Sequence, residues 1–293
     1  MKKVVIVGYG NIGQYAYNAV QSAPDMELVA IAEPNVDQVN GEIKLVKNID
    51  DIPHCDVALI CTPSRTVPEL AEKLLLRGIA TVDSYDIHSD IFEQQQRLDK
   101  AAKTGNAVSV TAAGWDPGTD SVIRVLLEAM APQGITYTNF GPGMSMGHSV
   151  VARSIEGVAD ALSMTIPTGT GVHRRMVYIT LESDADFDTV ASAIKADSYF
   201  CNDDTRVFQV ENIDELRDMG HGVRIERKGV SGDTHNQKFG FDMSVNNPAL
   251  TSQIMVSCAR AALRQAPGCY TMPELPPIDL LFGERESIIR RLV

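Results

Sequence analysis

The sequence lacks the cysteine and histidine spacings that mark metal sites and disulfide frameworks. Its five cysteines are scattered and include no CxxC pair: Cys55, Cys61, Cys201, Cys258 and Cys269. Its six histidines include no HxxxH pair. Structural and catalytic zinc sites need such ligands at short, regular spacing. We therefore expect no metal ion, and free thiols in a reducing compartment.

The chain also lacks an excess of positive charge and any long hydrophobic run near its N-terminus. With 38 acidic residues against 26 basic ones, its net charge of −12 repels phosphate backbones and anionic lipid. Lys2 and Lys3 precede an apolar run of only four residues, at 4–7, which is too short for a secretory signal or a membrane span. We expect a cytoplasmic protein without a nucleic-acid or membrane partner.

Short β-rich apolar runs alternate with helical patterns through the first part of the chain. The runs are VVIV at 4–7, ELVAIA at 27–32, DVALIC at 56–61, ATVD at 80–83 and AVSVT at 107–111. Helical spacing of apolar residues occupies 11–22 and 67–78, between the first runs. This alternation predicts an α/β fold whose first domain is a Rossmann-type parallel sheet.

The texture changes after Gly114, and a total of 293 residues favours two domains over one. A longer amphipathic stretch is followed by β-rich segments and a last helical pattern, at 117–130, 135–140, 174–183, 238–245 and 251–264. This indicates an α+β domain with antiparallel strands. We predict a first domain over 1–115, against which 250–293 packs back, and a second domain over 116–249.

A GxGxxG motif directly follows the first predicted strand and opens a helix, as a dinucleotide-binding loop requires. Its residues are Gly8, Tyr9, Gly10, Asn11, Ile12 and Gly13. The first glycine allows a tight turn, the second lets the backbone approach a pyrophosphate, and the third permits close packing of helix on strand. The helix N-terminus then faces the anion. The alternative is a glycine turn that holds no ligand.

The end of the second predicted strand, about 20 residues beyond the loop, decides between NAD and NADP. Glu33 lies there, and its carboxylate would bond the ribose diol and repel a 2′-phosphate, which favours NAD. Arg65 gives the opposite expectation, because it could hold that phosphate. The loop after the strand at 56–61 supplies Thr62, Pro63 and Ser64 as further cofactor contacts. Glu33 could alternatively be an ordinary solvated carboxylate.

Three short segments carry unusual chemistry for their length: DSYDIH at 83–88, GWDPG at 114–118 and FGPGMSMGHS at 140–149. The first two follow strands at the carboxyl edge of the predicted sheet, where open α/β folds bind ligands. They bring Asp83, Asp86 and Asp116 to the presumed nicotinamide. Several carboxylates beside the cofactor suit a cationic amine substrate. Each aspartate taken singly could instead serve turn geometry.

With these motifs, the sequence resembles the meso-diaminopimelate dehydrogenase family over nearly its full length. The resemblance rests on GYGNIG, the loop containing Ser64, DSYDIH, GWDPG, FGPGMSMGHS, His173-Arg174-Arg175, and Asn247-Pro248 before TSQ. It implies reversible NAD(P)-dependent oxidative deamination of meso-2,6-diaminopimelate at the D-centre, giving L-2-amino-6-oxopimelate and ammonia. It also implies a homodimer in which the second domain binds substrate and dimerises.

The resemblance implies a role for each matching position. Asp86 and Asp116 correspond to the catalytic carboxylates around the reacting amino group. The residues that shape the pocket are Trp115, Phe140, Met146 and Gly147, and those that hold the distal L-amino-acid end are Thr165, Arg175, His221 and Asn247. Arginine suits such a carboxylate because its guanidinium binds it in a bidentate manner. Met146 indicates a less polar pocket that also accepts other 2-keto acids for reductive amination to D-amino acids.

The sequence departs from the family pattern in two places. The family has basic residues where Glu33-Pro34 stands, so its usual cofactor is NADP whereas charge favours NAD here. The segment after His221 matches loosely, which leaves His235 as the alternative substrate contact and a structural role open for His221.

Two other functions remain open from the sequence. One is another two-domain NAD(P)-dependent reductase or dehydrogenase of a small amino-acid metabolite, which would lack the GWDPG and GPGMSMGHS pair. The other is a non-enzymatic nucleotide-sensing regulator, which would need no polar pocket beside the nicotinamide. The combination of Asp86, Asp116 and Arg175 argues against the regulator.

Overall fold

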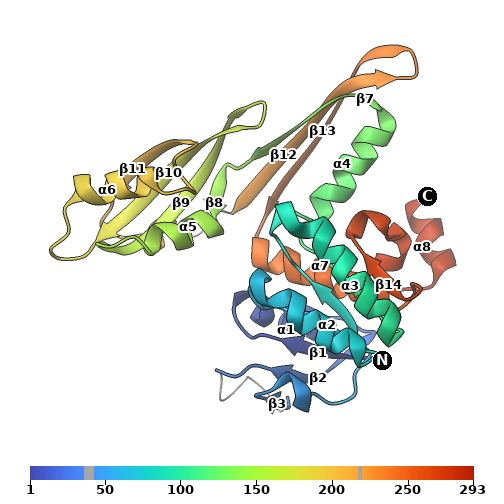
Figure 1. Ribbon diagram of the computed structural model, residues 1–293. Helices are drawn as coiled ribbons and strands as arrows, with labels where there is room; N and C mark the ends of the chain where they lie inside the picture. The colour runs from blue at the N-terminus through green and yellow to red at the C-terminus, as the bar shows by residue number, and fades with distance from the viewer. Residues whose placement is uncertain (36–42, 217–219) are drawn as a thin grey trace. The chain divides into compact units, whose positions relative to one another are not determined.

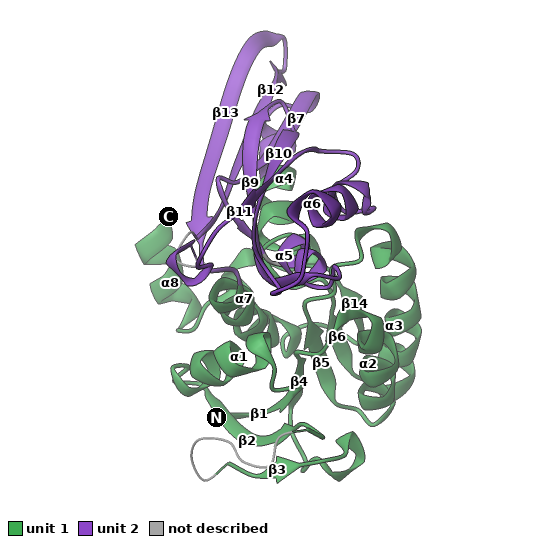
Figure 2. Ribbon diagram, turned by 90° about the vertical axis from the view of Figure 1, so that its left-hand side faces the viewer, with its two compact units in different colours: residues 1–125, 248–293 green, residues 126–247 purple. Residues whose placement is uncertain are grey.

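The computed structural model, which describes residues 1–35, 43–216 and 220–293, contains a seven-stranded parallel sheet. The strands are β1 (Lys2–Val7), β2 (Met26–Ala32), β3 (Leu45–Val46), β4 (Val57–Ile60), β5 (Ala80–Asp83), β6 (Val108–Val110) and β14 (Gly268–Tyr270). Their order is β14-β6-β5-β4-β1-β2-β3. Figure 1 labels β1, β2, β3 and β14, and Figure 2 labels all seven strands. The order reverses beside β1, which lies between β2 and β4. Open parallel sheets bind ligands at the carboxyl ends of the strands next to such a reversal.

Helices cover both faces of this sheet because its strands are apolar on both sides. The helices are α1 (Asn11–Gln21), α2 (Val67–Leu76), α3 (Ile91–Gly105) and α7 (Asn247–Ala262). Val4 and Ile6 of β1 pack in one core with α1 and α7. Their neighbours in β1, Val5 and Val7, pack in the opposite core with α2 and α3. The Rossmann-type sheet predicted from the sequence is thereby confirmed.

Helix α7 joins the sheet from the far end of the chain. The guanidinium of Arg260 forms two hydrogen bonds with the carboxylate of Asp25, at 2.6 and 2.9 Å, in the turn before β2. Ser252 donates its hydroxyl to the carbonyl of Ile12 in α1, at 2.9 Å. Polar contacts at both ends thus fix this helix to the face that α1 covers.

Two smaller sheets follow in the middle of the chain. The strands are β7 (Gln133–Phe140), β8 (Gly143–Ser145), β9 (Val158–Gly169), β10 (Val172–Leu181), β11 (Asp204–Gln209), β12 (His221–Ser231) and β13 (Thr234–Val245). One sheet has the order β11-β10-β9-β8 and the other β13-β12-β7. The expected α+β pattern is confirmed, with one difference: β10 and β11 are parallel. The reason is that helix α6 (Phe187–Ala196) crosses over between them, which returns the chain in the same direction.

The chain divides into two compact units, coloured separately in Figure 2. Unit 1 comprises Met1–Val125 and Pro248–Val293, and unit 2 comprises Leu126–Asn247. The division falls within helix α4 (Thr119–Met130). The remaining helices are α5 (Met146–Arg153) in unit 2 and α8 (Arg285–Leu292) in unit 1.

All five cysteines are free thiols, and they differ in exposure. Cys55, Cys258 and Cys269 are buried, Cys61 is intermediate, and Cys201 is exposed. Burial raises the pKa of the Cys61 thiol to about 12. Across the described residues, no helix combines the length and the apolar character that crossing a bilayer would demand.

Candidate active site

The glycine-rich loop after β1 has the geometry that its three glycines predict. Gly8 has φ of 93°, and a Cβ there would lie 2.8 Å from Thr62 Cγ2. A Cβ on Gly13 would lie 2.1 Å from the carbonyl oxygen of Gly8, so helix and strand meet too closely for a side chain. By contrast, a Cβ on Gly10 would meet no described atom within 4 Å. Protein packing therefore does not require glycine at position 10, whereas close approach of a pyrophosphate does.

Helix α1 begins directly after this loop with Gly10 as its N-cap, and no side chain caps it. Its first amides are the donors that bind an anion at a helix N-terminus. The cradle and the uncapped helix together fit a dinucleotide, with Gly8 to Gly13 holding its pyrophosphate. Tyr9, Asn11 and Ile12 lie in this stretch, with Gly10 and Asn11 exposed.

Glu33 follows the last residue of β2, beside the glycine-rich loop. Its carboxylate accepts hydrogen bonds from the backbone amides of Tyr9 and Asn35, both at 2.9 Å. Two amides therefore fix the orientation of this negative charge. The side chain is not a freely solvated carboxylate, which was the alternative that the sequence left open.

The loop after β4 joins the segment after β5 through a short hydrogen bond. Ser64 begins a short 3₁₀ turn, Ser64–Thr66, and its hydroxyl lies 2.5 Å from a carboxylate oxygen of Asp86. The same hydroxyl accepts the backbone amide of Asp86 at 3.2 Å. Asp86 remains exposed. Thr62 is half-buried and Pro63 is exposed in the same loop.

Asp83, the last residue of β5, is fully buried. One carboxylate oxygen accepts the amides of Tyr85 and Ala112 and the hydroxyl of Thr111, at 2.9–3.2 Å. Burial raises the pKa of this carboxyl group to about 6, although these hydrogen bonds lower it. Ala112 has φ of 57°, a backbone conformation that residues other than glycine rarely adopt. Asp83 thus organises the backbone at the carboxyl ends of β5 and β6.

The GWDPG segment after β6 folds into a closed loop. The amide of Gly114 donates to the carbonyl of Pro117 at 3.1 Å, and the carbonyl of Gly114 accepts the amide of Thr119 at 3.1 Å. A Cβ on Gly118, which has φ of 139°, would lie 2.1 Å from the Gly114 carbonyl oxygen. Only glycine fits such a closure. The loop buries Trp115 and leaves the neighbouring Asp116 partly accessible.

The carboxylate of Asp116 forms an ion pair with Arg124. Asp116 Oδ1 lies 2.8 Å from Arg124 Nη1, and only 9% of the aspartate side chain is exposed. Arg124 also lies 3.9 Å from the fully buried carboxylate of Asp120. The sequence analysis missed both Arg124 and Asp120. Their helical spacing of four residues was a detectable signal, because such residues lie on one face.

Phe140, at the end of β7 in unit 2, is held by a histidine from β10. The backbone amide of Phe140 donates to His173 Nε2 at 2.8 Å, and the two rings lie 5.7 Å apart. Burial and the nearby Arg175 lower the pKa of His173. The neutral imidazole that results is the form that can accept this amide.

Thr165 and Arg175 face one another across the β9–β10 ladder. Nη1 of Arg175 donates to the Thr165 hydroxyl, and Nε donates to Asp203 at 2.6 Å. Only 15% of the Arg175 side chain is exposed. Asp203 lies immediately before β11, and the sequence analysis did not identify it, because nothing in the NDD segment indicates which aspartate meets Arg175.

His221 lies beside β8, because a Cβ on Gly143 would lie 2.9 Å from its Cα, and Gly143 pairs with Thr165. His148 lies in α5, which follows β8 directly. Burial is the main cause that lowers the pKa of His148 to about 4, and the charges of Arg175 and His221 lower it further. His148 Nδ1 lies 2.9 Å from the hydroxyl of Ser145. Sequence reasoning placed His148 in a motif but gave it no role. Unit 2 therefore brings together Thr165, Arg175 and His221.

The alternative histidine, His235, lies at the other end of the β12–β13 hairpin. His221 pairs with Val245, whereas the last pair joins Ser231 to Thr234, next to His235. Along β13, His235 is therefore ten residues from Val245, the partner of His221. At roughly 3.3 Å per residue this is about 30 Å. This separation favours His221 as the histidine that acts with Arg175.

Three further predicted substrate contacts complete the set. Gly147 is exposed in the first turn of α5, and a Cβ there would meet no described atom within 4 Å. Asn247 is half-buried at the start of α7. The side chain of Met146 lies outside the described part of the structure.

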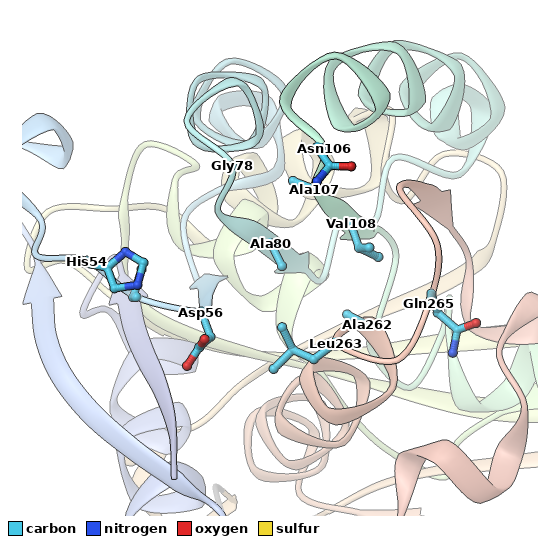
Figure 3. A pocket seen from close by; sticks show the side chains of 11 residues that line it. His54, Asp56, Gly78, Ala80, Asn106, Ala107, Val108, Ala262, Leu263 and Gln265 are labelled. Atoms are coloured by element: carbon cyan, nitrogen blue, oxygen red, sulfur yellow. The ribbon is translucent and has the colours of Figure 1, made fainter.

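A cavity of about 280 Å³ lies at the amino ends of the parallel strands, at the end of the sheet opposite the dinucleotide loop (Figure 3). Asp56, Ala80 and Val108 line it at the amino ends of β4, β5 and β6, while the dinucleotide loop follows the carboxyl end of β1. None of the predicted site residues lines this cavity. Within the described ranges, no group of three or more His, Cys, Asp or Glu side chains is arranged to hold a metal ion.

Two family models match the chain in tandem. The oxidoreductase family with an NAD-binding Rossmann fold matches residues 2–112, and the diaminopimelic acid dehydrogenase C-terminal domain matches residues 114–172. A meso-diaminopimelate D-dehydrogenase of Bacteroides fragilis is 56% identical over 300 residues, covering 100% of both chains.

Solved structures agree with these matches. Corynebacterium glutamicum DAP dehydrogenase in complex with DAP superposes with a TM-score of 0.88, at 29% identity, over 100% of this chain and 99% of that one. An engineered D-amino acid dehydrogenase bound to NADP+ has a TM-score of 0.82, at 28% identity and the same coverage. The chain therefore belongs to the meso-diaminopimelate dehydrogenase family of NAD(P)-dependent oxidoreductases.

Proposed function

We propose that this oxidoreductase catalyses the reversible oxidative deamination of meso-2,6-diaminopimelate at its D-centre, giving L-2-amino-6-oxopimelate and ammonia in diaminopimelate and lysine metabolism. The observation that carries the proposal is the match, at 56% identity over full length, to a relative named for this substrate. The acidic residues after β5 and β6 support it, because an amine substrate arrives as a cation.

In this proposal, Asp86 and Asp116 act on the D-amino group. A dinucleotide held by the glycine-rich loop would supply the nicotinamide ring as the acceptor for the α-hydrogen, which leaves as hydride. Before that step the ammonium loses a proton to a carboxylate or a water that Asp86 and Asp116 hold. Water then adds to the iminium, and the same carboxylates return protons as ammonia leaves. The protein contributes mainly orientation of the C–H bond and placement of charge.

The distal L-amino-acid end is assigned to unit 2. Arg175 pairs with the substrate carboxylate, while Thr165, His221 and Asn247 supply neutral hydrogen-bonding groups. The ion pair with Asp203 and the bond to Thr165 support this role, because they fix the guanidinium in a mostly buried position. Trp115, Phe140, Met146 and Gly147 shape the pocket, and Met146 extends its use to other 2-keto acids.

The cofactor contacts are assigned to the glycine-rich loop, Thr62, Pro63, Ser64 and Asp83, with Glu33 biasing the site toward NAD. Two amides fix the Glu33 carboxylate beside the loop, which favours repulsion of a 2′-phosphate over attraction by the exposed Arg65. Against this stands the NADP+ bound to an engineered relative. Initial rates with NAD and with NADP, measured for wild type and Glu33→Gln, test this preference. The ratio of the NADP rate to the NAD rate should be higher for the variant than for wild type.

We assign substrate binding and dimerisation to residues 116–249, and we expect a homodimer in the cytoplasm. Light scattering of the purified protein tests the oligomer, with twice the mass of the 293-residue chain as the expected result. A monomeric mass at micromolar concentration would contradict it.

An initial-rate assay with meso-, LL- and DD-diaminopimelate tests the main proposal. Reduced cofactor should form with the meso isomer and far more slowly with the LL isomer, which has no D-centre. Asp116→Asn should lose turnover while it still binds the dinucleotide. Unchanged turnover in this variant would overturn the role of Asp116, and no reduction with meso-diaminopimelate would overturn the function itself.

A further inference from the structure

Asp120, in the first turn of α4, is a carboxylate without a hydrogen-bond partner. It is fully buried, and neither of its carboxylate oxygens has a hydrogen-bond partner among the described residues. The guanidinium of Arg124 lies 3.9 Å away, beyond hydrogen-bond distance. Burial of an ionised carboxylate without hydrogen bonds is costly, and such a group becomes neutral instead. A position of this kind needs an explanation beyond packing.

Arg124 connects this carboxylate to Asp116. Its Nη1 lies 2.8 Å from Asp116 Oδ1, and its Nη2 is the atom nearest to Asp120. The amide of Asp120 also donates to the carbonyl of Trp115 at 2.8 Å, which fixes the first turn of α4 to the GWDPG loop. Two carboxylates thus share one cation, and full ionisation would leave an excess negative charge in a mostly buried place.

We propose that Asp120 is a positioning residue that sets, through Arg124, the charge on Asp116 and so its affinity for the substrate's proton. With Asp120 protonated, the two carboxylates no longer share the charge of Arg124, and the guanidinium holds Asp116 as a carboxylate. With Asp120 ionised, the guanidinium is shared and Asp116 becomes a stronger base toward the ammonium. This inference rests on the proposed function, because that proposal puts Asp116 beside the reacting amine.

The charged groups around Asp120 support this coupling. Burial and the Asp116 charge raise the pKa of Asp120 to about 7, and Arg124 lowers it. Helix α7 packs against the GWDPG loop through Thr251, an uncharged residue near Gly114. Because this pKa lies near neutral pH, the charge of Asp120 changes between pH 6 and pH 8.

The first test is the pH dependence of kcat/KM for deamination of meso-diaminopimelate by wild type and Asp120→Asn. The asparagine keeps the shape of the side chain but cannot ionise. The ratio of wild type to variant should rise on the order of tenfold between pH 6 and pH 8, as one pK unit of coupling implies. Glu128→Gln, which removes an exposed carboxylate from the same helix, should leave the ratio flat. Parallel profiles for wild type and Asp120→Asn would overturn the proposal.

The second test does not depend on turnover. Infrared difference spectra between pH 6 and pH 8 should contain a carboxylic-acid C=O band that Asp120→Asn removes, with Asp120→Ser as a second variant if the first folds poorly. Because Asp83, with a pKa of about 6, also contributes a band in this range, identical difference spectra for wild type and Asp120→Asn overturn the proposal. If the band is present but meso-diaminopimelate gives no turnover with wild type, the proposed function fails while the protonation of Asp120 stands.

Discussion

Gly10 and Gly13 lie three residues apart in one motif, yet they have opposite surroundings. Gly13→Ala would place a methyl group 2.1 Å from the Gly8 carbonyl, whereas Gly10→Ala meets no described atom within 4 Å. We expect Gly13→Ala to lower the melting temperature by several degrees. Gly10→Ala should fold normally but raise the Kd of the dinucleotide about tenfold, because its methyl group displaces the pyrophosphate. Thermal unfolding and fluorescence titration measure the two effects, and equal loss of stability in both variants would contradict this assignment.

Two adjacent aspartates, Asp203 and Asp204, allow a controlled test of the proposed role of Arg175 in binding the distal end of the substrate. Asp203 bonds Arg175, which is 15% exposed, while Asp204 bonds the more exposed Arg174. Asp203→Asn should raise the KM for meso-diaminopimelate about tenfold with a smaller change in kcat, because Arg175 loses the group that orients it. Asp204→Asn should leave both constants unchanged. Equal effects of the two substitutions would show that charge alone, not orientation, matters.

The residues that sequence reasoning identified differ in kind from those it missed. The glycines of GYGNIG could be assigned because each has a backbone reason that is legible in the motif. Asp203 and Arg124 act on the side chains of Arg175 and Asp116, and the sequence around Asp203 and Arg124 does not show the strand pairing and loop closure that create these contacts. Asp120 could have been suspected only from its spacing to Arg124.

At the scale of elements, an ion pair adds to the apolar packing that attaches helix α7 beside β2. Arg260 is 9% exposed and pairs with Asp25. Removing one partner of a largely buried pair leaves the other charge uncompensated, so Arg260→Met should cost about 3 kcal/mol in the free energy of unfolding. Arg290→Met, which breaks an exposed pair within α8, should cost less than about 0.5 kcal/mol. Urea denaturation of both variants measures the difference, and similar midpoints would contradict it.

The elements of unit 1 were largely predictable because continuous apolar runs and helical spacing alternate there. Strands β3 and β14 were missed, since two or three residues carry no periodicity. In unit 2, β9 and β12 were missed although they are long, because glycine, proline and charged residues interrupt their alternation. Hydrogen bonds to the neighbouring strands stabilise β9 and β12, and no local sequence pattern reveals which strands are neighbours.

At the scale of the whole molecule, buried carboxyl groups make stability depend on pH. Asp83 has a pKa of about 6 in the folded protein against an ordinary value of 3.8, so the folded state binds this proton more tightly. Its contribution is complete below about pH 4 and is lost as pH rises through 6. Relative to Asp83→Asn, wild type should lose about 2 kcal/mol between pH 4 and pH 7. Chemical denaturation across this range checks the sign, and a constant difference would contradict it.

The thiols of the folded protein should react in two classes. Cys201 is exposed and the other four are buried or intermediate, with a pKa of about 12 at Cys61, Cys258 and Cys269. We expect one thiol to react with Ellman's reagent within seconds, and the remaining four only after denaturant is added. Fast reaction of two or more thiols without denaturant would contradict this expectation, and Cys201→Ser should abolish the fast phase.

The exposed thiol has a practical consequence, because Cys201 lies two residues before Asp203, the partner of Arg175. A maleimide fluorophore would attach there without mutagenesis and would report on the surroundings of that arginine. Under the proposed role of Arg175, the wild-type chain would serve as a sensor in which emission, not absorbance of the reduced nucleotide, signals the arrival of a dicarboxylic amino acid.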